Sequence, residues 1–115
     1  MTSAVRMTVQ WLVRPQESGP IVAALHSLMM ATRGEPGCVK CQVSTELGNH
    51  AGLRYEEEWK SEVDLQRQLR SGRFTRLIEL VERATQHPQV EFALPGGARG
   101  LDYAEEVRRE LGELQ

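Results

Sequence analysis

The 115-residue sequence is short of aromatic residues, cysteines and long apolar runs. It has two tryptophans, two tyrosines, two phenylalanines and two cysteines. No apolar run approaches the roughly 18 residues that cross a membrane, and the first ten residues lack the apolar core of a signal peptide. The net charge is −2, without a basic cluster, which argues against nucleic acid and a membrane as partners. These properties predict one small globular domain in the cytoplasm.

The two cysteines stand in the tetrapeptide Cys38-Val39-Lys40-Cys41. A C-x-x-C spacing is typical of redox and zinc sites. The flanking residues predict a strand, however, and residues three apart on a strand point to opposite faces. The two thiols are then expected to diverge, and the sequence has no second Cys/His pair to complete a zinc site. We therefore interpret both cysteines as ordinary thiols and expect no metal.

Alternating apolar and polar residues predict four strands, over residues 5–14, 38–47, 53–60 and 89–94. Ser18 is the expected cap of a helix that has Gly19-Pro20 in its first turn. The expected buried face of this helix consists of Ile21, Leu25, Leu28, Met29 and Thr32. The segment 48–52 predicts a hairpin turn between the second and third strands.

The stretch from Leu53 to Ile78 organises the rest of the chain. Ser61 lies three residues before Asp64, a capping-box spacing that predicts the start of a helix after the third strand. Ser71-Gly72 predicts a break in that helix. The second helix is expected to bury the stripe Phe74, Leu77, Ile78 and Val81.

The element order is β-α-β-β-α-β, with the second helical segment split in two. This order predicts an α+β, ferredoxin-like fold with a four-stranded antiparallel sheet and helices on one face. Two helices are too few to shelter all the large apolar side chains of such a sheet, among them Trp11, Leu12, Cys41, Leu53 and Tyr55. We therefore expect a homodimer that packs sheet on sheet.

The C-terminal part is expected to be an appendage. Residues 1–95 are assigned to the ferredoxin-like domain, and residues 96–115 to a linker and a C-terminal amphipathic helix. The flexible linker is expected over residues 95–100, which are rich in glycine. The apolar stripe of the helix is Leu101, Ala104, Val107, Leu111 and Leu114. Its expected docking place is the dimer partner or the mouth of a pocket, and a frayed tail is the alternative.

Two motifs resemble those of the antibiotic biosynthesis monooxygenase superfamily. The segment Arg33-Gly34-Glu35-Pro36-Gly37-Cys38 resembles the family's R-x-E-P-G-C turn. Glu57-Glu58-Trp59, followed by Leu65, Ser71 and Phe74, resembles its E-x-W segment. The likeness covers about residues 6–94. It implies a dimeric α+β barrel, and several members oxidise aromatic polyketides or quinols with O₂ and no metal, flavin or haem.

The sequence departs from the family pattern at informative positions. Gln68 and Arg73 stand where the family often has histidine. In the haem-degrading branch, a tryptophan and a haem-ligating histidine are expected at the positions held here by Gln68 and Ile78. Isoleucine cannot ligate iron, which argues against the haem-degrading branch. The likeness to the cofactor-free oxygenases of the family then implies a protein without a cofactor.

The candidate site is a pocket between the helices and the sheet. Its expected aromatic lining is Trp11, Tyr55, Trp59 and Phe74, which suits a small, flat aromatic substrate. A cofactor-free oxygenase needs a base and a cation near the substrate anion. Glu57 is the candidate base and Arg73 the candidate anion partner.

Structural roles for these residues remain open alternatives. The aromatic side chains can be core, the run Glu56-Glu57-Glu58 can be solvated or ion-paired, and Arg73 can be exposed. A glutamate on the apolar face of a strand nevertheless requires a partner or a role. Two other functions compete with the monooxygenase: a non-catalytic dimeric barrel that binds a small apolar ligand or serves in assembly, and a related barrel enzyme such as a lactone isomerase or a stress-response protein.

Overall fold

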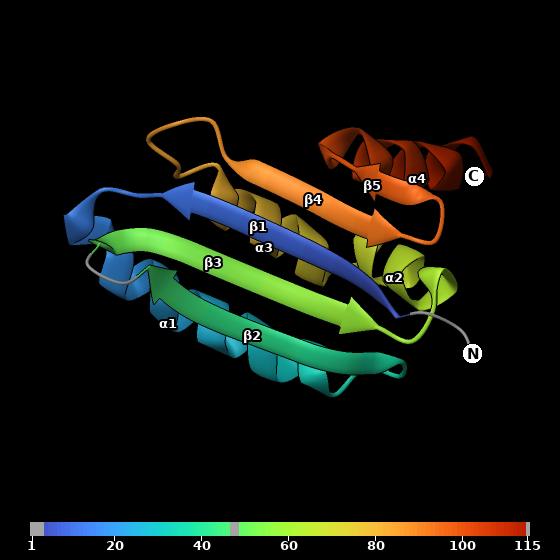
Figure 1. The fold of residues 1–115 in the computed structure, drawn as a ribbon, viewed down its shortest axis with the longest axis horizontal. Coiled ribbons are helices and arrows are strands. Elements are labelled where there is room, and N and C mark those ends of the chain that lie inside the picture. Colours follow the sequence, from blue (N-terminus) through green and yellow to red (C-terminus); the bar gives the residue numbers. More distant parts are fainter. Residues whose placement is uncertain (1–3, 47–48, 115) are drawn as a thin grey trace.

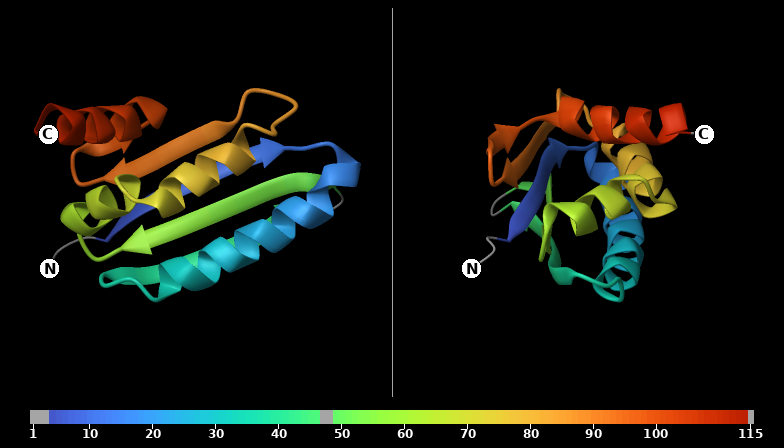
Figure 2. Two further views of the ribbon diagram at one scale, coloured as in Figure 1. Left: turned by 180° about the vertical axis from the view of Figure 1, so that it is seen from behind. Right: turned by 90° about the vertical axis from the view of Figure 1, so that its right-hand side faces the viewer.

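A computed structural model describes residues 4–46 and 49–114 as one sheet with helices packed on one side (Figure 1). The elements in chain order are β1 (Val5–Leu12), α1 (Pro15–Arg33), β2 (Cys38–Glu46), β3 (Asn49–Trp59), α2 (Glu62–Leu69), α3 (Gly72–Val81), β4 (Gln89–Leu94), β5 (Gly97–Arg99) and α4 (Leu101–Leu114). The edge-on view in Figure 2 shows α1, α2 and α3 on the same face of the sheet. The predicted ferredoxin-like α+β plan is therefore confirmed for the single chain.

The sheet has five antiparallel strands in the order β2-β3-β1-β4-β5. The prediction of four strands is wrong, because part of the expected linker, Gly97–Arg99, turns back and pairs with β4. Strand β3 also begins at Asn49, so most of the segment predicted as a hairpin turn is strand. Gly48, in the remaining part of that turn, lies outside the described residues.

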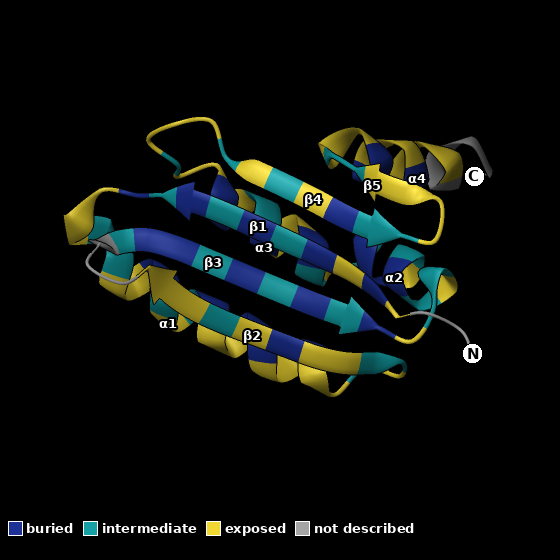
Figure 3. Cartoon of the chain, viewed as in Figure 1, coloured by how far each residue is buried: buried dark blue, intermediate teal, exposed yellow. Residues whose placement is uncertain are grey.

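One face of the sheet carries nearly all of its buried side chains. Along β1 and β3, buried residues alternate with partly exposed ones (Figure 3). Trp11, Cys41, Leu53 and Tyr55 are each 3% exposed or less within a single chain. The expectation that these four side chains need a partner subunit for cover is wrong, because α1, α2 and α3 cover this face of the sheet within one chain. Leu12, the fifth residue of that expectation, alternates to the other face of β1 and is partly exposed.

The opposite face of the sheet is polar. Strand register places Thr8 and Gln10 of β1 beside Glu56 and Arg54 of β3 on this face. Glu56 of β3 pairs there with Lys40 across the strands at 3.4 Å, as expected for cross-strand residues of opposite charge. It also accepts from Arg54, two residues earlier on the same strand and face, at 3.0 Å. A partner subunit that packs on this face of the sheet would therefore meet charged side chains.

Local signals explain most helix boundaries. Helix α1 begins at Pro15, three residues before the expected cap Ser18, because proline is well suited to the first turn of a helix. Its buried face is Ile21, Leu25, Leu28, Met29 and Thr32, as predicted. Ser61 caps α2 by accepting from the amide of Asp64, and Ser71 caps α3 by accepting from that of Phe74.

Helix α4 docks on its own chain, beside β4 and α2 (Figure 2). Tyr103, Ala104 and Val107 are buried there, whereas Leu101 is 38% exposed, so the predicted stripe is wrong at that residue. The Tyr103 ring packs on Phe92 with ring centroids 5.2 Å apart. The side chains of Leu111 and Leu114 lie outside the described residues.

A β-bulge at Val39 changes the orientation of the two cysteines. Cys38 lies opposite Trp59 while Lys40 lies opposite Glu58, which leaves Val39 as an extra residue in β2. Val39 is 51% exposed. Because of this extra residue, Cys38 and Lys40 point to opposite faces of the sheet, although residues two apart on a regular strand share a face.

As a result, both thiol-bearing residues belong to the face that the helices cover. Cys41 lies opposite Glu57, and Cys38 lies opposite Trp59, two strand positions away on the same face. Both cysteines are free. The prediction that they diverge is wrong, since it assumed a regular strand.

Candidate functional site

The candidate site is centred on the carboxylate of Glu57, which lies under the helices and is 1% exposed. Tyr55 donates its hydroxyl to Glu57 Oε2 at 2.7 Å. Trp59 donates its indole N–H to Glu57 Oε1 at 2.9 Å. Tyr55, Glu57 and Trp59 alternate along β3 and therefore share its helix-facing side. Sequence spacing alone thus brings two aromatic donors to one buried acid.

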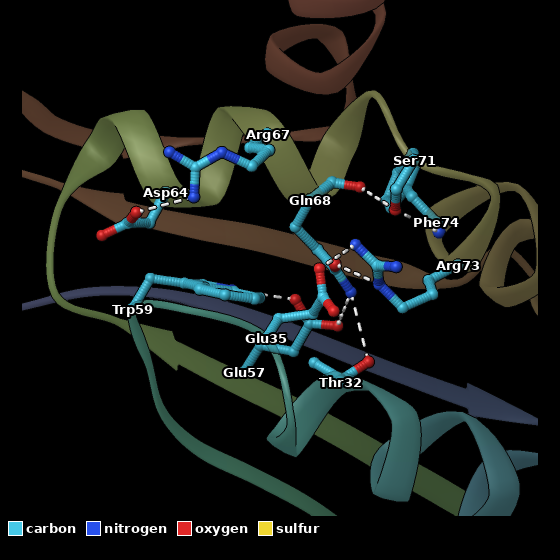
Figure 4. A network of polar contacts seen from close by, with 10 residues as sticks. All are labelled: Thr32, Glu35, Glu57, Trp59, Asp64, Arg67, Gln68, Ser71, Arg73 and Phe74. Atoms are coloured by element: carbon cyan, nitrogen blue, oxygen red, sulfur yellow. Dashed lines mark hydrogen bonds and ion pairs between the residues drawn. The ribbon is translucent and has the colours of Figure 1, made fainter.

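A third donor comes from a helix. Gln68 of α2 is 2% exposed, and its Nε2 donates both to Glu57 Oε2 and to Thr32 Oγ1, each at 3.2 Å. Gln68 follows Leu65 by three residues and precedes Leu69, so it belongs to the buried face of α2. Its amide therefore joins β3, α1 and α2 at a single carboxylate (Figure 4).

Arg73 connects this buried group to the protein surface. Its Nε donates to Gln68 Oε1 at 2.8 Å, and its Nη2 lies 2.9 Å from Glu35 Oε1 (Figure 4). The Arg73 and Glu35 side chains are 28% and 33% exposed. A continuous set of polar contacts thus leads from Glu57 through Gln68 to an ion pair at the surface.

Burial raises the pKa of the Glu57 carboxyl above its usual range, because desolvation penalises the charged form. The hydrogen bonds from Tyr55, Trp59 and Gln68, and the positive charge of Arg73, oppose this rise. A carboxyl group whose pKa is raised above its usual range is a stronger base when ionised, which suits it to proton transfer.

The thiol of Cys41 extends the network on its other side. Its Sγ donates to the Tyr55 hydroxyl at 3.2 Å. Burial raises the pKa of Cys41 to about 12, and it also raises that of Tyr55. Both groups are therefore neutral near pH 7, and the Tyr55 hydroxyl remains available to donate to Glu57.

The structure brings together four of the polar and aromatic residues singled out in the sequence and separates two others. Tyr55, Glu57 and Trp59 are in direct contact, and Arg73 reaches them through Gln68. Trp11 lies opposite Leu53, four residues along β1 from the Met7–Glu57 pair, or about 13 Å away along the strand.

Phe74 lies at the start of α3, and the guanidinium of Arg108 in α4 is 5.8 Å from its ring centroid. It is 4% exposed. Trp11 has a buried indole N–H that lacks a hydrogen-bond partner among the described residues. Trp11 therefore does not share the immediate surroundings of Glu57, and the ring of Phe74 faces Arg108 of α4.

Packed side chains occupy the space around Glu57. Tyr55, Glu57, Trp59 and Gln68 are each 2% exposed or less, and a void wide enough for water beside them would leave their atoms accessible. A substrate can reach Glu57 only if neighbouring side chains move.

Sequence reasoning missed the contacts of Gln68, Thr32 and Glu35. Gln68 could have been recognised from its place between Leu65 and Leu69 on the apolar face of α2, where a polar residue requires a partner. Thr32 was assigned to the buried face of α1, but nothing in the sequence pairs it with Gln68.

Solved structures share this fold. A conserved protein from Methanosarcina mazei Go1 has 28% sequence identity and a TM-score of 0.73, over 81% of this chain and 93% of that one. A protein titled antibiotic biosynthesis monooxygenase has 21% identity and a TM-score of 0.68, over 76% and 94%. Rv0793 from Mycobacterium tuberculosis has 21% identity and a TM-score of 0.69, over 81% and 95%.

The resemblance to the antibiotic biosynthesis monooxygenase superfamily is confirmed for the fold. No protein-family model matches the sequence. No curated protein matches it either. None of the helices in the described part of the chain has the length and apolar character that a membrane crossing needs.

Proposed function

We propose that this protein is a cofactor-independent monooxygenase of the antibiotic-biosynthesis type, acting on a small quinol-like or polyketide-like aromatic substrate. The observation that carries the proposal is the buried carboxylate of Glu57, held by three donors on a fold shared with such a monooxygenase. A raised pKa suits Glu57 to act as a base near neutral pH.

In the proposed reaction, Glu57 removes a proton from the substrate, and the electron-rich anion that results reduces O₂. One oxygen atom enters the substrate and the other leaves as water, so the substrate supplies all the electrons. Arg73 is 28% exposed and 2.9 Å from Glu35, and it is the proposed cation beside the substrate anion. Tyr55 and Trp59 are the proposed aromatic contacts. Trp11, which lies about 13 Å away along the sheet, and Phe74, whose ring faces Arg108, are not part of this site.

Access to Glu57 requires a local movement. Gln68 is the group that lies between Glu57 and Arg73, and the Arg73–Glu35 pair is partly exposed. We propose that an aromatic substrate enters by displacing Arg73 from Glu35 and Gln68, because an exposed ion pair costs little to break. The substrate anion then replaces Glu35 as the partner of Arg73.

The test is O₂ consumption with model hydroquinones and anthrone-like substrates. Glu57→Gln is expected to abolish turnover, since it removes the base. The matched control is Glu58→Gln, the neighbouring residue in β3, which belongs to the polar face of the sheet and is expected to keep turnover. Equal turnover in both variants would remove Glu57 from the reaction.

A non-catalytic dimeric barrel is the second candidate, and the closed packing around Glu57 favours it. In that case the three donors to Glu57 only stabilise a buried polar group. The protein would then consume no O₂ with any aromatic reductant, and a ligand would raise its melting temperature without turnover. Homodimerisation, which both candidates include, is testable by analytical ultracentrifugation.

A further inference from the structure

A groove between α3 and α4 has a lining that the proposed reaction does not use. It has a volume of about 290 Å³, at the lower end of the range for small-molecule sites. The α3 helix contributes the apolar side chains of Phe74 and Ile78, and α4 contributes Leu101 and Ala104. We call this feature the α3–α4 groove.

Carboxylates surround this apolar lining. Glu79 and Glu82 come from the end of α3, and Glu105 comes from α4. Glu79 pairs with Arg76 at 3.1 Å, whereas Glu82 and Glu105 make no ion pair with any residue the structure describes. Two carboxylates beside the groove are thus free to attract a positive charge.

The cation that lines the groove is already engaged. Arg108 donates to the backbone carbonyl of Leu69 at 2.7 Å and to Thr75 Oγ1 at 3.0 Å. Its guanidinium also lies 5.8 Å from the ring centroid of Phe74. These acceptors are neutral, so Arg108 keeps its positive charge at the groove. The lining sets three carboxylates, Glu79, Glu82 and Glu105, against this one arginine, so the balance of charge that a ligand meets is negative.

We propose that the α3–α4 groove binds a small organic cation, with an apolar body against Phe74 and Ile78 and an ammonium group beside Glu82 and Glu105. The apolar side chains favour burial of a hydrocarbon or aromatic body. The carboxylates favour a cation over an anion of the same shape. This site is independent of Glu57 and of the proposed oxygenation.

The test compares three probes that share one apolar body: 2-phenylethylammonium, 2-phenylethanol and 3-phenylpropionate. Binding is followed by amide chemical shifts in ¹H–¹⁵N spectra of the full chain. The ammonium probe is expected to bind about tenfold more tightly than the propionate, the effect of two exposed charge interactions of ordinary strength. Its shifts are expected at residues of α3 and α4.

Two variants separate charge from shape. The double variant Glu82→Gln/Glu105→Gln removes both free carboxylates, and it is expected to eliminate the preference for the cation while keeping the fold. Its matched control is Glu58→Gln/Glu91→Gln, which removes two carboxylates from the other face of the sheet and is expected to keep the preference. Ile78→Trp fills the groove and is expected to weaken all three probes.

The proposal would be overturned by equal or tighter binding of the propionate, by an unchanged preference in the Glu82→Gln/Glu105→Gln protein, or by shifts that map away from α3 and α4. The proposal would also be overturned if 2-phenylethylammonium at millimolar concentration caused no amide chemical-shift change. None of these outcomes depends on O₂ consumption, so the groove and the proposed oxygenation fail separately.

Discussion

Gln68 and Glu57 lie eleven residues apart in the chain and contact each other in the core, with Gln68 Nε2 3.2 Å from Glu57 Oε2. The same amide nitrogen bonds Thr32, and the amide oxygen accepts from Arg73. Gln68 is therefore the one side chain that touches the buried acid, helix α1 and the surface cation. Its contacts hold Glu57 in place and separate it from solvent.

Gln68→Ala is expected to destabilise the protein by about 1–3 kcal/mol, because it leaves buried polar partners unsatisfied. The loss is measured by urea unfolding at pH 7. Gln42→Ala, at an exposed position on β2, is the control and is expected to stay within about 0.5 kcal/mol of the parent. Equal stability of the two variants would contradict the role assigned to the Gln68 amide.

The pH dependence of stability reports on Glu57. Because its pKa is raised in the folded state, the folded protein binds this proton more tightly than the unfolded chain does. The Glu57 contribution to the free energy of unfolding is therefore complete below the usual pKa of about 4.3. It is lost as pH rises from there through the raised folded-state pKa.

Glu57→Gln removes this titration. The difference in unfolding free energy between the parent and Glu57→Gln is expected to change with pH in that window. Urea titrations from pH 4 to pH 8 measure it. If Glu57 is the base, turnover rises over the upper part of the same window as the carboxyl ionises. A stability difference that does not vary with pH would contradict the raised pKa.

The bulge at Val39 yields a prediction about thiol reactivity. Cys38 is partly buried, while Cys41 is 1% exposed with a pKa of about 12. A thiol reagent at pH 8 is expected to modify only Cys38 in the folded protein and both cysteines in urea, because the thiolate is the reactive form. Peptide mass analysis identifies the modified residue, and Cys38→Ser is expected to leave a folded protein that does not react.

Gly37 occupies a position that only glycine tolerates. Its φ is +85°, and a Cβ atom there would overlap the carboxylate of Asp64. Gly37→Ala is expected to cost at least about 1–2 kcal/mol from the left-handed conformation alone. Gly72→Ala is the control, because a Cβ at Gly72 meets open space, and it is expected to leave stability unchanged or slightly higher.

Much of the secondary structure was predictable from sequence, because it depends on neighbours along the chain. The buried face of α1, the Ser61 cap and strand β4 all follow from spacings of two, three or four residues. Ser71-Gly72 was predicted as a break between two helices, and Ser71 is the cap of the second. The same alternation placed Tyr55, Glu57 and Trp59 on one face of β3. Sequence alone therefore identified a buried acid between two aromatic residues.

Tertiary structure decided what surrounds that acid. Gln68 of α2 reaches Glu57, and Thr32 of α1 reaches Gln68, only when the helices pack on the sheet. No local periodicity encodes which side chain of a helix lies over which position of a strand. The bulge at Val39 reversed the predicted divergence of the cysteines, because one extra residue exchanges the two faces of a strand. Helix α4 likewise found its place through contacts of Tyr103 with Phe92 and Gln66, which lie far from it in the sequence.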